Sequence, residues 1–199
     1  RATFDLDGKL LKGADLLFLG GGKNNEQIEI GRTLAGVQDS SGNFVISPTS
    51  YLYKVENSPA AGKGYYSLRS GNGFINSTTD LPEDIINRGI GLIHFFGHSG
   101  SNIFDVDIQD ASQYNNFGKY PLMIAAGCYG GDFTESIKSF GERFVLEKGR
   151  GSIGYLANST VGTITQLREY GSDFYNNAFG DSYGLPMGDI VRETIRDFL

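Results

Sequence analysis

The sequence holds 199 residues, of which 39% are hydrophobic, and its formal net charge at pH 7 is −6. This length and apolar content suit one folded domain, and we expect residues 1–199 to form it as a piece of a longer protein. The negative charge argues against nucleic acid or an anionic membrane surface as the partner, and no apolar run approaches the ~18 residues of a membrane span. With one cysteine and two histidines, the chain cannot form an internal disulfide, and a zinc site is not expected.

Four continuous apolar runs predict strands that are buried on both faces. In chain order they are residues 14–22, 89–100, 120–131 and 151–160, and residues 47–56 form a weaker fifth candidate. Helical patterns alternate with them at residues 25–38, 79–88, 143–148, 163–179 and 187–198. Ser139 and Glu142 have the spacing of a capping box ahead of the third helix. Strands that alternate with helices predict an α/β fold, a three-layer domain in which a mostly parallel sheet carries helices on both faces.

The ends of the predicted strands are where a site is expected, because open parallel sheets bind ligands at the carboxyl edge. These ends lie at residues 20–24, 97–101, 127–131 and 158–160. His98 and Cys128 follow the second and third strands and are 30 residues apart (128 − 98), about one strand–connection–strand unit. We therefore expect these two residues to emerge side by side at one edge of the sheet.

The stretch GHSGS at residues 97–101 is close to the GxSxG motif of serine hydrolases, with Ser101 in place of the second glycine. That motif needs a histidine later in the chain, and none follows Ser99. We therefore reject Ser99 as a triad nucleophile. The other histidine, His94, lies inside the apolar run and is expected to be a hydrogen-bonded core residue.

Cys128 is the better candidate for a nucleophile. A thiolate is intrinsically nucleophilic, and a neighbouring imidazole such as that of His98 favours the ionised form. Glycines beside both positions, Gly97 and Gly127, let a substrate backbone approach. The backbone N–H groups of Ser99 and Cys128 could converge on a developing oxyanion. A lone cysteine after a strand is also a common small core residue, so the residues by themselves leave both interpretations open.

Three segments taken together resemble the gingipain family of cysteine peptidases, which share the caspase-like fold. They are FFGHSGSNIFD, NNFGKYPLMIAAGCYGGDF and SFGERFVLEKGRGSIGYLANST, in that order. The similarity runs from LLFLGGGKNNEQ to the final helices and is closest to the gingipain-like domains of Bacteroidetes type IX secretion sortases and related surface proteins. It implies a three-layer caspase-like domain and a cysteine endopeptidase or sortase-like transpeptidase, which acts through an acyl-enzyme on exported proteins.

For the catalytic residues, the resemblance implies that His98 is the general base or acid and that Cys128 is the nucleophile. Ser99 would contribute only a backbone N–H to the oxyanion site. Glu26 is the candidate for an acid that orients the histidine, although a solvated charge at a helix start is the favoured interpretation of this residue.

The substrate pocket implied by the resemblance is built from strand ends, namely Gly97, Gly127, Tyr129, Asn158, Ser159 and Thr160. No acidic pocket for an arginine or lysine side chain is evident, so the specificity of gingipains is not carried over. Asp105, Asp107 and Asp110 are a weak candidate for structural calcium, because their spacing lacks the glycine and closing glutamate of an EF-hand loop. A solvated acidic loop with Asp110 near a helix start is the favoured interpretation, and no other cofactor is expected.

The resemblance also implies a location in the periplasm, at the outer membrane or outside the cell, with protein substrates and secretion-machine partners. The alternative from a different class is an inactive scaffold or docking domain that keeps the fold. Loss of either His98 or Cys128 would favour the scaffold, and both residues are present.

Overall fold

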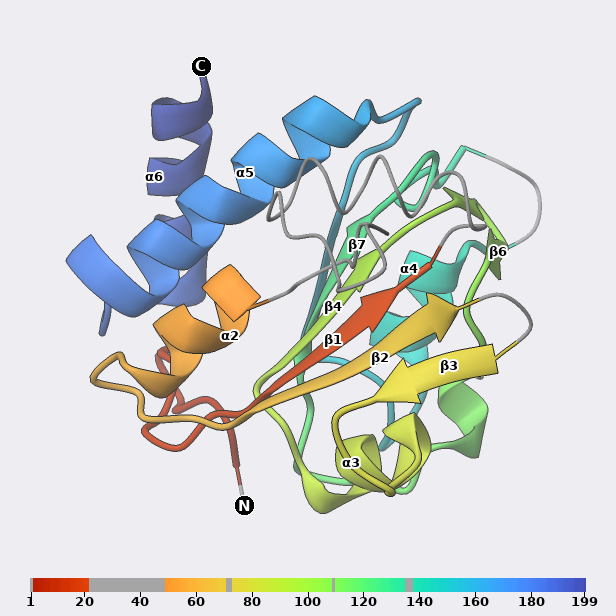
Figure 1. Cartoon of the computed structure of the whole chain (residues 1–199), viewed down its shortest axis with the longest axis horizontal. Helices are drawn as coiled ribbons and strands as arrows, with labels where there is room; N and C mark the ends of the chain where they lie inside the picture. Colours follow the sequence, from red (N-terminus) through yellow and green to blue (C-terminus); the bar gives the residue numbers. More distant parts are fainter. Residues whose placement is uncertain (1, 22–48, 71–72, 109, 135–137) are drawn as a thin grey trace, which may run out of the picture.

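A computed structural model describes residues 2–21, 49–70, 73–108, 110–134 and 138–199. Their main feature is a six-stranded sheet with the order β3-β2-β1-β4-β7-β8 (Figure 1). The strands are β1 (Leu16–Gly20), β2 (Gly64–Ser70), β3 (Gly73–Asn76), β4 (Leu92–Phe96), β7 (Leu122–Ala126) and β8 (Gly154–Ala157). A short hairpin of β5 (Ser99–Gly100) and β6 (Ile103–Phe104) follows β4.

The central strands confirm the expectation of a buried, mostly parallel sheet. All residues of β1, β4 and β7 are buried, and the pairs β2–β1, β1–β4, β4–β7 and β7–β8 are parallel. Only the β2–β3 pair of this sheet is antiparallel. Continuous apolar runs suit such strands because both of their faces are covered.

Helices cover both faces of the sheet, as Figure 1 shows. On one face lie α2 (Thr49–Glu56), α5 (Ile164–Asn176), the π-helical turn η2 (Asn177–Asp181) and α6 (Met187–Phe198), whose buried side chains pack on the even-numbered residues of β1, β4 and β7. On the other face lie α3 (Pro82–Arg88), α4 (Phe140–Leu146) and the 3₁₀ turn η1 (Ala111–Gln113), which pack on the odd-numbered residues. The predicted three-layer arrangement is therefore confirmed.

The expected strand at residues 47–56 is wrong, because the described part of that segment is helix α2. Its buried residues Tyr51, Leu52 and Val55 follow a helical spacing, which places one apolar face against the sheet. Strands β2 and β3 come after this helix and were not anticipated. The predicted helix at residues 25–38 lies outside the described residues.

The helix ends follow the chemistry read from the sequence. α3 begins at Pro82 and is followed by Gly89, whose φ of 102° is easily adopted by glycine. Ser139 and Glu142 form the predicted capping box, although α4 starts at Phe140, three residues before the predicted start. Thr163 caps α5, as its side chain accepts a hydrogen bond from the backbone N–H of Gln166.

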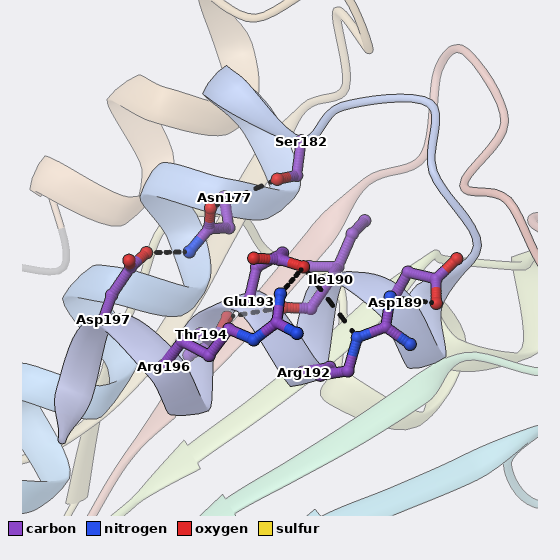
Figure 2. A network of polar contacts seen from close by, with 9 residues as sticks. All are labelled: Asn177, Ser182, Asp189, Ile190, Arg192, Glu193, Thr194, Arg196 and Asp197. Atoms are coloured by element: carbon purple, nitrogen blue, oxygen red, sulfur yellow. Dashed lines mark hydrogen bonds and ion pairs between the residues drawn. The ribbon is translucent and has the colours of Figure 1, made fainter.

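Helix α6 is attached to the end of α5 by a small polar network, shown in Figure 2. The buried Asn177 donates from Nδ2 to Asp197 Oδ2 at 2.7 Å and accepts from the hydroxyl of Ser182 at 3.3 Å. The ion pairs of Arg192 and Arg196 along α6 are exposed and contribute little. Asn177 therefore fixes the position of α6.

No helix in the described part of the chain has the length and apolar character needed to cross a membrane.

Candidate active site

The ends of β4 and β7 lie side by side and are joined directly. Phe96 and Ala126 are register partners at the ends of these strands, and the N–H of Gly97 donates to the carbonyl of Ala126 at 3.1 Å. Two residues further along each loop, the hydroxyl of Ser99 donates to the carbonyl of Cys128 at 2.8 Å. The expectation that the loops of His98 and Cys128 are neighbours at one sheet edge is therefore confirmed.

Gly127 is required for this close approach of the two loops. A Cβ atom at Gly127 would overlap the Ser99 hydroxyl and would lie 2.9 Å from the carbonyl oxygen of Gly97. Such a distance is shorter than real Cβ contacts, so a side chain here would push the loops apart.

The loop after β8 forms the third wall of the site. The N–H groups of Tyr129 and Gly131 donate to the carbonyls of Thr160 and Asn158, each at 2.9 Å. The thiol of Cys128 lies 3.8 Å from the carbonyl oxygen of Gly162 and can donate to it. Two of the three predicted pocket residues of this loop are thus bonded to the segment that carries the cysteine.

The predicted pocket residues around Cys128 and on the β8 loop differ in burial. Gly127 is buried, Gly97 and Asn158 are half-buried, and Ser159 and Thr160 are exposed. Ser159 is the member of the predicted pocket for which no bond to the Cys128 segment is described.

Tyr129 has a left-handed backbone conformation with φ of 54°. Aromatic residues rarely adopt it, because Cβ then crowds the following carbonyl. Its side chain is 43% exposed, and its N–H is held by Thr160. Strained residues of this kind persist where surrounding bonds fix them, and they concentrate at functional sites. Here the left-handed conformation of Tyr129 turns the chain just after the cysteine.

The N–H of Ser99 is directed away from the β5–β6 hairpin. The N–H of Asp105 donates to the carbonyl of His98 at 3.0 Å, and Ser99 pairs with Phe104. In an antiparallel ladder, the residue next to a hydrogen-bonded pair belongs to a non-bonded pair, whose N–H groups point outward. The Ser99 N–H therefore points out of the hairpin and takes no part in its ladder.

The two histidines have opposite surroundings. His98 is exposed, whereas His94 in the middle of β4 has no exposed surface. The His94 ring stacks on Tyr51 and Tyr175, and its Nδ1 lies 3.1 Å from the hydroxyl of Tyr175. Burial lowers the pKa of His94 to about 3, so this imidazole is neutral. The predicted hydrogen-bonded core histidine is confirmed.

Among the acidic candidates, Asp110 has a structural role. Asp110 caps η1 by accepting from the N–H of Ser112, and it pairs with Arg143 at 2.8 Å. The bond to the Ser112 N–H is the main cause that lowers the pKa of Asp110. Across the described residues, Asp105 and Asp107 do not join it or other side chains in a group that could hold a metal ion. Glu26 lies outside the described residues.

A cavity of about 440 Å³ lies next to the cysteine loop. Its lining includes Ala126 at the end of β7, Gly162 beside the thiol, and Asn158 and Thr160 of the β8 loop. This volume is within the usual range for sites that bind small molecules or side chains. The strand ends thus supply both a thiol and a neighbouring pocket.

A comparison with models of protein families identifies the family of this chain. The sequence model of Peptidase family C25 matches residues 14–199. The chain belongs to peptidase family C25. This is the gingipain family of cysteine peptidases, as the sequence resemblance indicated. No curated protein matches the chain.

Solved structures of C25 peptidases share the fold. The complex of the pro- and mature domains of RgpB from Porphyromonas gingivalis matches with a TM-score of 0.64 at 13% identity, over 100% of this chain and 45% of that one. The Arg-specific cysteine proteinase gingipain R (RgpB) matches with a TM-score of 0.65 at 14% identity, over 100% of this chain and 44% of that one. The chain thus spans less than half the length of these structures, and at this identity the likeness establishes the caspase-like fold.

Two contributors to this C25 site were missed in the sequence. Gly162, whose carbonyl faces the thiol, is one of 29 glycines and carries no motif. The Ser99 hydroxyl, which bonds the two loops together, was assessed in the sequence only as a nucleophile, so this structural role was not predicted. Its place between His98 and a glycine at a strand end was the available signal.

Proposed function

We propose that this domain is a cysteine peptidase in which Cys128 and His98 cleave peptide bonds of exported proteins. The observation that carries the proposal is the direct bonding of the two loops, through Ser99 to Cys128 and Gly97 to Ala126. It holds the loop of the chain's one cysteine against the loop of an exposed histidine, at the sheet edge where ligands bind.

In the first step, His98 takes the proton from the thiol as the thiolate of Cys128 attacks the substrate carbonyl carbon. A C–S bond forms, and the carbonyl oxygen becomes an oxyanion that the N–H groups of Ser99 and Cys128 stabilise. The C–N bond then breaks, and the imidazolium of His98 returns its proton to the departing amine. The product is a thioester on Cys128.

In the second step, an acceptor releases the acyl group. His98 takes a proton from water or from an amine as either attacks the thioester, and the sulfur regains its proton when the C–S bond breaks. Water gives hydrolysis, and an amine gives the transpeptidation of sortase-like relatives. No cofactor takes part in this scheme.

The surface around the cysteine suits a polypeptide substrate. Tyr129, Phe133 and Val161 are exposed apolar side chains on the loops that carry Cys128 and Gly162. Exposed apolar groups gathered beside a reactive residue are typical of a peptide-binding surface. The resemblance to gingipain-like surface proteins supports a location in the periplasm, at the outer membrane or outside the cell, and secretion-machine partners would deliver the substrate there.

The test is covalent labelling of Cys128 by a peptidyl acyloxymethyl ketone, read by intact mass. We expect one adduct on the unmodified chain and none on Cys128→Ala. His98→Ala should slow labelling by about 100-fold or more, the usual contribution of a general base. Circular dichroism of each variant checks that the fold is retained.

The matched control is His94→Gln, which alters the other histidine and should leave the labelling rate of Cys128 within a few-fold. Labelling of His98→Ala at the unmodified rate would contradict the dyad. An unmodified chain that is folded but never labelled would favour the scaffold, and a partner protein would then be sought.

A further inference from the structure

We propose that a second pocket of this domain, on the face of the sheet that α3 covers, binds the side chain of an arginine in a polypeptide ligand. None of the described residues that line this pocket belongs to the loops of His98 and Cys128. The inference therefore goes beyond the proposed function. It depends on the apolar walls of the pocket and on the oxygen acceptors that it presents.

The pocket has a volume of about 260 Å³ and lies between the sheet, α3 and the segment that follows β6. Leu19 lines it from the sheet, Ile86 from the helix, and Val106 and Ile108 from the segment, and all four are buried. In Figure 1, α3 lies at the β2–β3 end of the sheet, away from α5 and α6. Sites for whole small molecules usually measure about 300–1,000 Å³, so the smaller volume suits one side chain.

Three lining residues form a row across neighbouring strands. Leu19 in β1 is the register partner of Ser67 in β2, and Ser67 is the register partner of Asn76 in β3. The side chains of register partners lie on the same face of a sheet, and Leu19 packs in the core cluster on the α3 face. The hydroxyl of Ser67 and the amide of Asn76 are therefore directed to the face where the pocket lies.

Ser67 provides a hydroxyl that the fold itself does not use. The residue is only 6% exposed, and its hydroxyl has no hydrogen-bond partner among the described residues. Buried polar groups without a partner are rare in folded proteins, so this one indicates a place for a ligand group. The hydroxyl is not one of the fully enclosed unpaired atoms, and Ser67 lines the pocket. A ligand in the pocket can therefore reach it.

Two carboxylates give the pocket its charge. Glu83 in the first turn of α3 and Asp107 after β6 line it from two sides. Two arginines of the surrounding elements are engaged in other contacts. Arg88 forms an ion pair with Asp80, and Arg69 donates to a backbone carbonyl. Apolar walls with carboxylates beside them suit a long side chain that has an apolar stem and a cationic end.

Arginine fits this pocket better than lysine. Its planar guanidinium has five N–H donors and can meet the oxygens of Ser67, Asn76 and Glu83 together, whereas an ammonium has three donors at one point. Phe74 also lines the pocket, is 50% exposed, and is two residues from Asn76 on the same face of β3. A guanidinium stacks on such an aromatic ring, which adds to the preference for arginine.

The first experiment titrates ¹⁵N-labelled Cys128→Ala with a blocked Gly-Arg-Gly peptide and follows the backbone amide signals. Without the nucleophile, the result is independent of peptidase activity. With peptide up to about 10 mM, enough for millimolar binding, we expect saturable shifts at Ser67, Asn76 and Glu83. Absence of these shifts, or shifts confined to the loop of residue 128, overturns the proposal.

Two further peptides test the chemistry of recognition. Citrulline replaces the guanidinium by an uncharged urea of nearly the same shape, and this peptide should bind at least about tenfold more weakly than the arginine peptide. The lysine peptide should bind about threefold or more weakly, because it loses the stacking and the planar set of donors. Equal binding of the citrulline peptide overturns the cation site, and equal binding of the lysine peptide overturns the assignment to arginine.

The charge of the pocket is tested by Glu83→Gln, which keeps the shape of the side chain. The arginine peptide should bind about tenfold more weakly to this variant, as expected for the loss of one charged hydrogen bond. Asp84→Asn is the matched control, because it makes the same change of charge in the same turn of α3, at an exposed residue that does not line the pocket. Equal effects of the two variants would indicate general attraction to an acidic surface and overturn the pocket.

Ser67→Ala separates binding of a ligand from a structural role. Since the hydroxyl has no partner among the described residues, its removal should keep or raise the melting temperature. The arginine peptide should nevertheless bind at least about threefold more weakly, because one acceptor is lost. A lower melting temperature together with unchanged binding would show a structural serine and overturn its assignment to the site.

Discussion

At the scale of single residues, His94 and His98 show how position in a strand decides the chemistry of one residue type. Their side chains are separated by four positions, yet His94 is inside the sheet and His98 lies beyond its edge. Because the interior disfavours an imidazolium, only His98 is placed to exchange protons with a substrate in solution. The same burial of His94 has a measurable effect on stability.

Acid should destabilise the fold through His94. Burial lowers its pKa from 6.5 to about 3, so the unfolded chain binds more protons between these values. Stability therefore falls as the pH drops through this window, by about 2 kcal/mol between pH 7 and pH 5. Urea unfolding at the two pH values measures the loss. The His94→Phe, Tyr175→Phe double variant should lack it, and an equal loss in that variant would show that other groups are responsible.

Tyr129 makes a second prediction at this scale. Its φ of 54° costs a non-glycine residue roughly 1 kcal/mol, and a β-branched residue more. Tyr129→Gly should therefore keep or raise the melting temperature, whereas Tyr129→Val should lower it. If both variants melted alike, the left-handed conformation would not be a source of strain. Labelling of Cys128 in Tyr129→Gly would show how far the strained turn positions the thiol.

At the scale of elements, some helix ends are determined by the local sequence and others by tertiary packing. The capping box of Ser139 and Glu142 is local, and it is present as the spacing predicted. The end of α5 is not determined by its local sequence. The expected helix to residue 179 instead becomes the π-helical turn η2 from Asn177, since this turn supplies the buried amide that binds α6.

Asn177→Ala should loosen α6. It removes the hydrogen bonds to the exposed carboxylate of Asp197 and the half-buried hydroxyl of Ser182, which water can then satisfy, so we expect a cost of about 0.5–1.5 kcal/mol. Urea unfolding gives this number. Arg196→Ala removes only an exposed ion pair of the same helix and should cost well under 1 kcal/mol. Equal effects of the two changes would contradict the role given to Asn177 in Figure 2.

At the scale of the whole molecule, the site exists because three strand ends meet at one edge of the sheet. β4, β7 and β8 are neighbours, and their loops are joined by hydrogen bonds among Ser99, Cys128, Tyr129 and Thr160. Any change that separates the loops should therefore remove reactivity without unfolding the core.

Gly127→Ala is that change. Its Cβ would overlap the Ser99 hydroxyl, so the loops of His98 and Cys128 must move apart. We expect ketone labelling of Cys128 to slow by at least about tenfold while the circular dichroism spectrum is kept. Gly130→Ala is the matched control, because its Cβ would meet its nearest neighbours at 3.5 Å or more, which is ordinary contact. Equal rates in both variants would contradict the need for close loops.

The sequence by itself determined the strands β1, β4, β7 and β8, most helix ends, and the meeting of the His98 and Cys128 loops at one edge. The predicted burial on both faces holds for β1, β4 and β7, whereas β8 at the edge of the sheet is half-buried. Continuous apolar runs, capping residues and a spacing of one strand–connection–strand unit are local signals, and they depend on little else. Only the tertiary structure decided that residues 49–56 are helix α2. It also decided that α5 ends in a π-helical turn, that Tyr129 is left-handed, and that the Nδ1 of His94 meets the hydroxyl of Tyr175. These features arise from contacts between segments far apart in the chain, and the periodicity of a single segment does not indicate which distant segments it will contact.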